Sequence, residues 1–130
     1  MNMKPQCLRG SDIEETWFEE GCYIQEWSND ADDADCSIAR ARVPARSSTR
    51  WHRLHGIAER YVVLEGTGRV ELGAADSASF IARPIAPGDV VRIPPGVPQR
   101  VHAGEADLVF LAVCTPRFRP EAYEDIERSV

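Results

Sequence analysis

The stretch WHRLHGIAERYVVLEG, Trp51 to Gly66, contains side chains whose types and spacing suit metal binding or proton transfer. His52 and His55 lie three positions apart, and Glu59 lies four positions after His55. Imidazole and carboxylate groups together bind Fe, Mn, Ni, Cu or Zn. The same groups can instead hydrogen-bond each other in a pocket that holds an organic molecule. The stretch therefore leaves two alternatives open, a metal site and a metal-free binding pocket.

Alternation of side chains along a strand separates the two histidines. In an extended strand, residues 52 and 54 share one face, and residues 53 and 55 share the other. The simpler interpretation places His52 and Leu54 inside. His55 precedes Gly56 and reaches the inside only if the strand ends or bulges there.

Glu59 and Tyr61 share one face of the next segment by the same alternation. If Glu59 points into the interior, the Tyr61 hydroxyl points there too. Both are then candidate catalytic groups that bind or protonate a substrate. The alternative for Tyr61 is a core aromatic residue whose hydroxyl makes one satisfied hydrogen bond.

Length and charge limit the number of domains and the classes of partner that this chain can have. The chain has 130 residues, enough for one compact domain. Its formal net charge of −6 argues against binding of nucleic acid, which requires clustered Lys and Arg. No apolar run approaches the roughly 18 residues of a membrane span, and the first residues lack the apolar core of a secretion signal. We expect a cytoplasmic protein with a small-molecule ligand and no nucleic-acid or membrane partner.

The four cysteines are scattered along the chain and form no CxxC pair. In a reducing compartment they are expected to be free thiols, and a zinc finger is not predicted. Cys114 ends an apolar segment, where it is either a small core residue or a thiol at the binding site. No base adjoins it in the sequence, so no activated thiolate is predicted. The others are Cys7, Cys22 and Cys36.

Short, partly alternating segments separated by Gly and Pro predict a β-sandwich or barrel. A capping-box pattern at Ser11 and Glu14 predicts a short N-terminal helix that ends at Gly21. Pro120 predicts the first turn of a short C-terminal helix. The expected strands lie within residues 22–27, 36–43, 60–73, 79–85 and 106–115.

The stretch around His52 and a second stretch, GDVVRIPPGVPQRVH, resemble the two sequence motifs of the cupin superfamily. In the first motif, two histidines are separated by one residue, and a glutamate follows after three or four more residues. A glycine comes after six further residues. Glu59 and Gly66 fit this second half of the motif. In the second motif, Gly88, Pro94 and Gly96 fall in place. The resemblance implies an all-β fold, a double-stranded β-helix (jelly-roll) barrel, in agreement with the strand pattern.

The resemblance also implies a metal held by three histidines and one glutamate. Glu59 matches the glutamate, and His52 matches the first histidine if four residues separate the histidine pair from Glu59, which leaves Leu54 in the second position. With three intervening residues, His55 takes the second position instead. Gln99 stands in the third position, where its amide oxygen is a weaker ligand than imidazole. The implied ligands are His52, His55, Glu59 and Gln99.

Two functions follow from this resemblance. One is a metal-dependent oxygenase or isomerase with a divalent Fe, Mn, Ni, Cu or Zn ion, since two histidines and one carboxylate with open positions suit Fe(II). The other is a metal-free sensor or carrier that binds a small ligand through hydrogen bonds. Small single-domain cupins are often dimers, so the resemblance also implies a homodimer.

The chain is expected to form one domain in three parts. Residues 1–36 form an N-terminal segment with edge strands, residues 37–115 form the cupin barrel, and residues 116–130 form a tail with the short helix. Arg40 and Arg42 share one strand face, where they either face solvent or grip an anion inside the barrel. The burial habits of arginine favour the solvent face.

Overall fold

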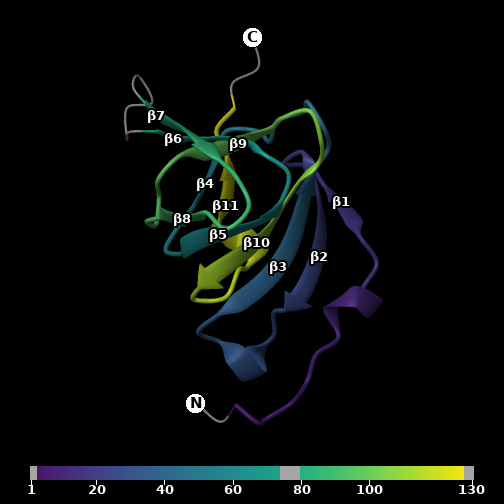
Figure 1. Cartoon of the computed structure of the whole chain (residues 1–130). Coiled ribbons are helices and arrows are strands. Elements are labelled where there is room, and N and C mark those ends of the chain that lie inside the picture. The colour runs from purple at the N-terminus through teal and green to yellow at the C-terminus, as the bar shows by residue number, and fades with distance from the viewer. Residues whose placement is uncertain (1–2, 74–79, 128–130) are drawn as a thin grey trace.

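Two antiparallel β-sheets enclose the core of this protein (Figure 1). The computed structural model describes residues 3–73 and 80–127. One sheet has the strand order β1, β2, β3, β10, β5, β8, and the other has the order β11, β4, β9, β6, β7. This arrangement confirms the predicted jelly-roll fold.

The strands of the first sheet are β1 (Thr16–Phe18), β2 (Cys22–Ser28), β3 (Ser37–Val43), β10 (Leu108–Thr115), β5 (Ala58–Glu65) and β8 (Val90–Ile93). Those of the second are β11 (Tyr123–Asp125), β4 (His52–Leu54), β9 (Gln99–Ala103), β6 (Gly68–Gly73) and β7 (Phe80–Ile85). Three 3-10 turns accompany them: η1 (Gly10–Asp12), η2 (Ala31–Asp33) and η3 (Pro120–Ala122).

Alternating burial along the strands builds the interior. On β5, Glu59, Tyr61 and Val63 are buried, while the residues between them are partly exposed. The apolar strand β10 lies between β3 and β5 and pairs with both, which explains its nearly continuous run of apolar residues. The largest fully buried apolar side chains are Phe110 and Leu108. The strand pattern in the sequence thus places one face of β5, carboxyl group included, inside the protein.

The predicted C-terminal helix is wrong. After the single turn η3, the chain extends as β11 and pairs with β4, with Tyr123 opposite Leu54 and Asp125 opposite His52. A short isolated helix is only marginally stable in water. Backbone pairing to β4 and packing of Tyr123 against the Leu54 cluster therefore override the local helical preference.

The predicted N-terminal helix is also wrong. Its middle forms β1, which pairs with β2 so that Trp17 lies opposite Tyr23. Gly21 has a φ of 113° in the turn between the two strands, a conformation that side chains other than glycine rarely adopt. The glycine read as a helix end is therefore the turn of a hairpin.

None of the helical turns in the described residues is long and apolar enough to cross a membrane.

Two motif glycines should differ in their tolerance of alanine. Gly66 has a φ of +78°, and an added Cβ would lie 2.2 Å from the carbonyl oxygen of Asp107. Gly88 has a φ of +95°, but an added Cβ would meet nothing within 4 Å. Left-handed backbone costs a side chain roughly 1–2 kcal/mol. We expect Gly88→Ala to cost about that much, and Gly66→Ala to cost about 2 kcal/mol more because the backbone must also shift.

Urea unfolding followed by tryptophan fluorescence measures both losses. Equal destabilisation by the two substitutions would contradict the close approach at Gly66.

Candidate functional site

A cavity of about 280 Å³ lies between the sheets and opens beside β1. Its volume is near the lower end of the range for small-molecule sites. Its carboxyl and imidazole groups come from the β1–β2 turn (Glu20), β2 (Glu26), β4 (His52) and β5 (Glu59), and the walls are largely apolar and aromatic. The residues that line it include Phe18, Glu20, Glu26, His52, Glu59, Tyr61, Phe110, Cys114 and Phe118.

His52 and Glu20 form a buried pair inside this cavity. The His52 side chain is 2% exposed, and its Nε2 lies 3.2 Å from Oε1 of Glu20. Its Nδ1 donates a hydrogen bond of 2.6 Å to the carbonyl oxygen of Arg50. Since Nδ1 carries a hydrogen for that bond, Nε2 of the neutral imidazole carries none and is an acceptor for the acid form of Glu20.

Burial determines where that proton lies. Removal from water lowers the pKa of His52, despite the opposing effect of the Arg50 carbonyl. The same cause raises the pKa of Glu20 to about 7, although the Cys22 thiol counters it by donating a hydrogen bond of 3.6 Å. A neutral imidazole facing a carboxylic acid is therefore the favoured state just below neutral pH.

Glu59 is the second buried carboxyl of the cavity. Its Oε2 accepts a weak hydrogen bond of 3.8 Å from the Cys114 thiol, and its Oε1 is buried with no partner among the described residues. Burial raises the pKa of Glu59 to about 7, and the charge of Glu20 adds to the rise. His52 and Gln99 counter it in part. A buried carboxyl oxygen without a partner is rare in folded proteins and calls for a functional explanation.

Tyr61 and Gln99 form a hydrogen-bonded pair behind Glu59. The Tyr61 hydroxyl donates to Oε1 of Gln99, and both side chains are buried. The Tyr61 ring packs against Phe110 with a centroid distance of 4.4 Å. Burial and the charge of Glu59 hold the pKa of Tyr61 well above its usual range. Tyr61 is thus a protonated donor that orients the Gln99 amide.

The predicted site residues do not all meet. His52, Glu59 and Tyr61 line the cavity, and Gln99 lies beside it through its bond to Tyr61. His55 is exposed and faces away, where its Nε2 lies 2.7 Å from Oε1 of Glu124. Leu54 takes the inward place of the second histidine, as strand alternation indicated.

The donor groups in the cavity do not fit a transition-metal ion. Among the described residues, no group of three or more His, Cys, Asp or Glu side chains is arranged to hold one. His52 is the one imidazole on the described cavity wall, and the Gln99 oxygen already accepts from Tyr61. Burial raises the pKa of the Cys22 and Cys114 thiols, so both are protonated at neutral pH when no metal is bound.

Glu20 is the site residue that the sequence did not reveal. It stands next to the turn residue Gly21, in a segment predicted to be helical. The useful signal was the pair of aromatic segments around Gly21, which marks a β-hairpin. Read as a hairpin, the turn would have placed an acidic side chain at one end of the barrel.

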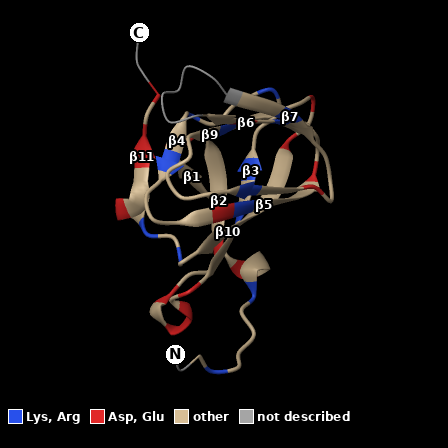
Figure 2. Cartoon of the chain, turned by 90° about the vertical axis from the view of Figure 1, so that its left-hand side faces the viewer, with Lys and Arg blue, Asp and Glu red and all other residues tan. Residues whose placement is uncertain are grey.

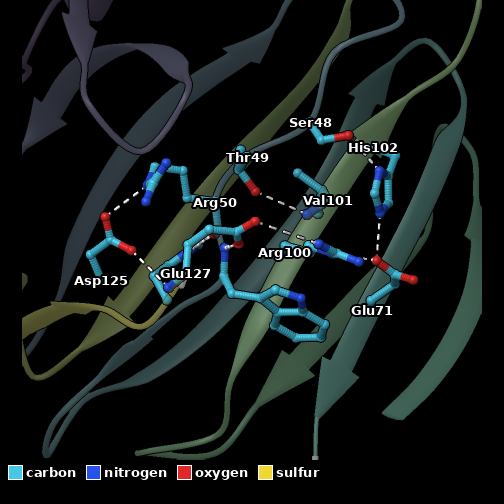
Figure 3. Close-up of polar contacts among 11 residues, drawn as sticks. Ser48, Thr49, Arg50, Glu71, Arg100, Val101, His102, Asp125 and Glu127 are labelled. Carbon is cyan, nitrogen blue, oxygen red and sulfur yellow. Dashed lines mark hydrogen bonds and ion pairs between the residues drawn. The ribbon is translucent and has the colours of Figure 1, made fainter. Parts of the chain in front are cut away.

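The C-terminal strap, Tyr123–Glu127, pairs with β4 at the edge of its sheet and contacts His52. The Tyr123 ring stacks on the imidazole at 5.3 Å between centroids. The Arg50 guanidinium donates to Asp125 at 2.7 Å, and Glu127 accepts from the backbone N–H of Trp51 at 2.7 Å (Figure 3). Figure 2 shows the same complementarity as acidic β11 beside basic β4. The strap thus holds Arg50 and Trp51, the two residues before His52, and the Arg50 carbonyl orients the imidazole ring.

A separate polar network covers the outer face of the second sheet (Figure 3). The His102 ring bridges Ser48 and the buried Glu71, and Arg100 donates to the same carboxylate at 2.5 Å. The Arg100 guanidinium also lies 4.6 Å from the centre of the Trp51 ring. His102 therefore belongs to a structural cluster outside the cavity.

Arg40 and Arg42 lie on the outer face of the first sheet, where both pair with Glu15 at 2.8–3.0 Å. Arg42 also pairs with Asp107 at 2.9 Å. The alanines that alternate with them on β3 line the cavity instead. Both arginines thus lie at the surface, and no cationic side chain of β3 enters the cavity.

Comparison with known proteins agrees with this geometry. The Cupin domain family model matches residues 39–114. The chain belongs to the cupin family. An uncharacterized protein of Methanocaldococcus jannaschii is 34% identical over 92 residues, which cover 70% of this cupin and 66% of the relative. This cupin therefore spans just under two thirds of that relative.

Solved structures share the fold at low identity. Streptomyces Pac13, a nucleoside dehydratase, is 13% identical with a TM-score of 0.77, and the match covers 98% of this cupin and 95% of Pac13. CapF, a capsular polysaccharide assembling protein of Staphylococcus aureus, is 16% identical with a TM-score of 0.76. That match covers 89% of this cupin but only 34% of CapF.

The buried carboxyl of Glu59 should make stability depend on pH. Its pKa is about 7 in the folded protein against an ordinary 4.5, so the unfolded chain loses this proton first as pH rises. The stabilising contribution is full below pH 4.5 and is lost as pH rises to about 7. The Glu59→Gln variant has no carboxyl to ionise at this position, so it should not lose this stability. Relative to wild type, we expect the variant to gain up to about 3 kcal/mol between pH 5 and pH 8.

Chemical denaturation at several pH values measures this gain. The matched control is Glu65→Gln, which changes an exposed glutamate of the same strand and should show no such trend. A difference between Glu59→Gln and wild type that stays constant with pH would refute the raised pKa.

Stacking of the Tyr123 ring should keep water away from the His52 imidazole. In Tyr123→Ala, water reaches the imidazole, so the lowered pKa of His52 should rise toward its ordinary value. Tyr123→Phe keeps the ring and should leave that pKa unchanged. NMR titration of His52 in wild type and in both variants measures the effect. An unchanged His52 titration in Tyr123→Ala would exclude this role.

Proposed function

We propose that this cupin binds a small polar molecule in the cavity and catalyses proton transfer on it, in an elimination or isomerisation. Glu59 is the proposed base, and the His52–Glu20 pair is the proposed acid. The observation that carries the proposal is the buried, unpartnered Oε1 of Glu59, a residue that lines the same cavity as the His52–Glu20 pair.

The proton affinities of these groups suit that role. General acid–base catalysis works best when the pKa of the catalytic group lies near the working pH. Burial raises the pKa of Glu20 and the pKa of Glu59 to about 7. The two carboxyls repel each other's charge, so one holds a proton while the other is ionised over a range around neutral pH.

The steps balance without a further reagent. Ionised Glu59 takes a proton from a substrate carbon, and the electron pair of the broken C–H bond forms a double bond. A neighbouring C–O bond breaks, and the leaving oxygen takes the proton held between His52 and Glu20. Water leaves, Glu59 is protonated, and the His52–Glu20 pair has lost one proton. Transfer of a proton between the two groups through the cavity or solvent restores the starting state.

The comparisons support this proposal only at the level of the fold. Pac13, which has nearly the same extent as this cupin, is a nucleoside dehydratase, and its variants were solved with uridine. A barrel of this size therefore can carry an elimination reaction. The assignment to the present chain rests on its own three titratable groups.

Metal analysis of the purified protein tests the metal-dependent interpretation. Because only one imidazole reaches the cavity, we expect purified protein to contain far less than one Fe, Mn, Ni, Cu or Zn per chain, also after incubation with each metal. Elemental analysis of wild type and His52→Ala measures this. Near-stoichiometric metal that is lost in His52→Ala would favour the oxygenase or isomerase interpretation over the present one.

Two further predictions stay predictions. The homodimer agrees with the open sheet edges at β8 and β7, since such edges invite pairing. The cytoplasmic location follows only from the sequence composition.

The acid–base proposal is tested by activity. In a screen of small hydroxylated compounds in D₂O, NMR detects loss of water or exchange of a C–H proton. We expect Glu59→Gln to lower kcat by about 10²–10⁴-fold with little change in binding. We also expect kcat/KM to be greatest near pH 7, where one carboxyl is ionised and the other protonated. The control Glu65→Gln should keep full activity. Binding without turnover or exchange would identify a sensor or carrier instead.

A further inference from the structure

A cysteine thiol contacts each of the two carboxyls in the proposed reaction. The Cys114 thiol donates to Oε2 of Glu59 at 3.8 Å, and the Cys22 thiol donates to Oε2 of Glu20 at 3.6 Å. Both cysteines are buried. The proposed proton transfer uses neither thiol, yet the same weak contact occurs at both ionisable groups.

In both carboxyls, the thiol contacts one oxygen and the reaction needs the other. Oε1 of Glu20 lies 3.2 Å from Nε2 of His52, and Oε1 of Glu59 is the buried oxygen without a partner among the described residues. The last torsion of a glutamate side chain is broad and roughly two-fold, so the two oxygens exchange places when the carboxyl rotates. A donor at Oε2 favours one orientation and therefore keeps Oε1 in its place.

Strand pairing fixes the backbone that carries each thiol. Cys114 lies on the central strand β10, opposite Glu59 on β5 and opposite Ser37 on β3. Cys22 begins β2 and lies opposite Phe18 on β1. Each sulfur thus belongs to a paired strand, so its position beside the carboxyl is set by the sheet.

A thiol suits these positions better than a stronger donor. Burial raises the pKa of both carboxyls to about 7, and the thiols lower it only in part. A strong donor at Oε2 would stabilise the ionised form and lower the pKa further. The S–H group is a weak donor, and burial raises the pKa of both thiols, so the hydrogen is present at neutral pH. A thiol can therefore orient a carboxyl and leave its proton affinity near neutrality.

We propose that Cys114 and Cys22 are positioning residues of the site. Cys114 holds Oε2 of Glu59 and leaves Oε1 free to accept a substrate proton. Cys22 holds Oε2 of Glu20 and keeps Oε1 against Nε2 of His52. Their part in catalysis rests on the proposed function, whereas the two contacts do not.

Infrared spectroscopy of the S–H stretch tests the contacts directly. This band shifts to lower frequency when the thiol donates a hydrogen bond, and cysteine-to-alanine variants assign each band. We expect the Cys114 band to move to higher frequency in Glu59→Leu, which has no acceptor, and the Cys22 band to do the same in Glu20→Leu. Cys36 is the control, because its thiol donates to the carbonyl oxygen of Ser37 and its band should stay in place. Unmoved Cys114 and Cys22 bands would overturn the proposal.

Kinetics test the positioning role on any compound that the screen identifies as a substrate. We expect Cys114→Ala to lower kcat about tenfold, because Glu59 samples unproductive orientations, with KM nearly unchanged. Cys114→Ser keeps a donor and should recover part of the loss. Cys36→Ala should keep full activity, since Cys36 does not line the cavity. Equal kcat in wild type and Cys114→Ala, or equal losses in the alanine and serine variants, would exclude positioning by the thiol.

The two proposals fail separately. If the S–H bands respond as expected but wild type and Glu59→Gln show no turnover, the acid–base function is wrong and the thiol contacts stand. If turnover depends on Glu59 but the bands do not respond and Cys114→Ala keeps its kcat, the function stands and the positioning role is wrong.

Discussion

Burial of two carboxyl groups beside one histidine is the constraint on which the rest of this site depends. Glu20 and Glu59 lie in an apolar cavity that opposes their charge, and His52 cannot take up a proton easily for the same reason. The site therefore holds fewer charges at neutral pH than its residue types suggest. Burial sets these proton affinities, and it leaves Glu59 Oε1 without a partner among the described residues.

The fold holds these groups together, although their burial lowers the stability of the folded protein. Three separate segments contribute them: the β1–β2 hairpin with Glu20, β4 with His52 and β5 with Glu59. The C-terminal strap pairs with β4 in the same sheet and holds the backbone that orients the imidazole. Buried groups that oppose folding above neutral pH are typical of functional sites, where stability is given up for reactivity.

The sequence predicted the fold and half of the site, and the reasons are physical. Periodicity and the motif glycines are local signals, so the jelly roll and the inward faces of β4 and β5 could be predicted from them. Alternation also favoured Leu54 over His55 for the inward place, as the structure has it. The role of Glu20 is not local, since it depends on a hairpin that crosses the barrel mouth. Strand β11 was missed for a similar reason, because its preference is decided by pairing with a strand about 70 residues earlier.

The most direct test of the account is the proton affinity of Glu59 itself. Carbon-13 NMR of the glutamate carboxyls, assigned with Glu20→Gln and Glu59→Gln, follows each titration in the native protein. We predict that Glu59 titrates at about 7 and that its titration moves down when Glu20 becomes Gln, because the repelling charge is gone. A Glu59 carboxyl that titrates near 4.5, unaffected by Glu20→Gln, would contradict the account.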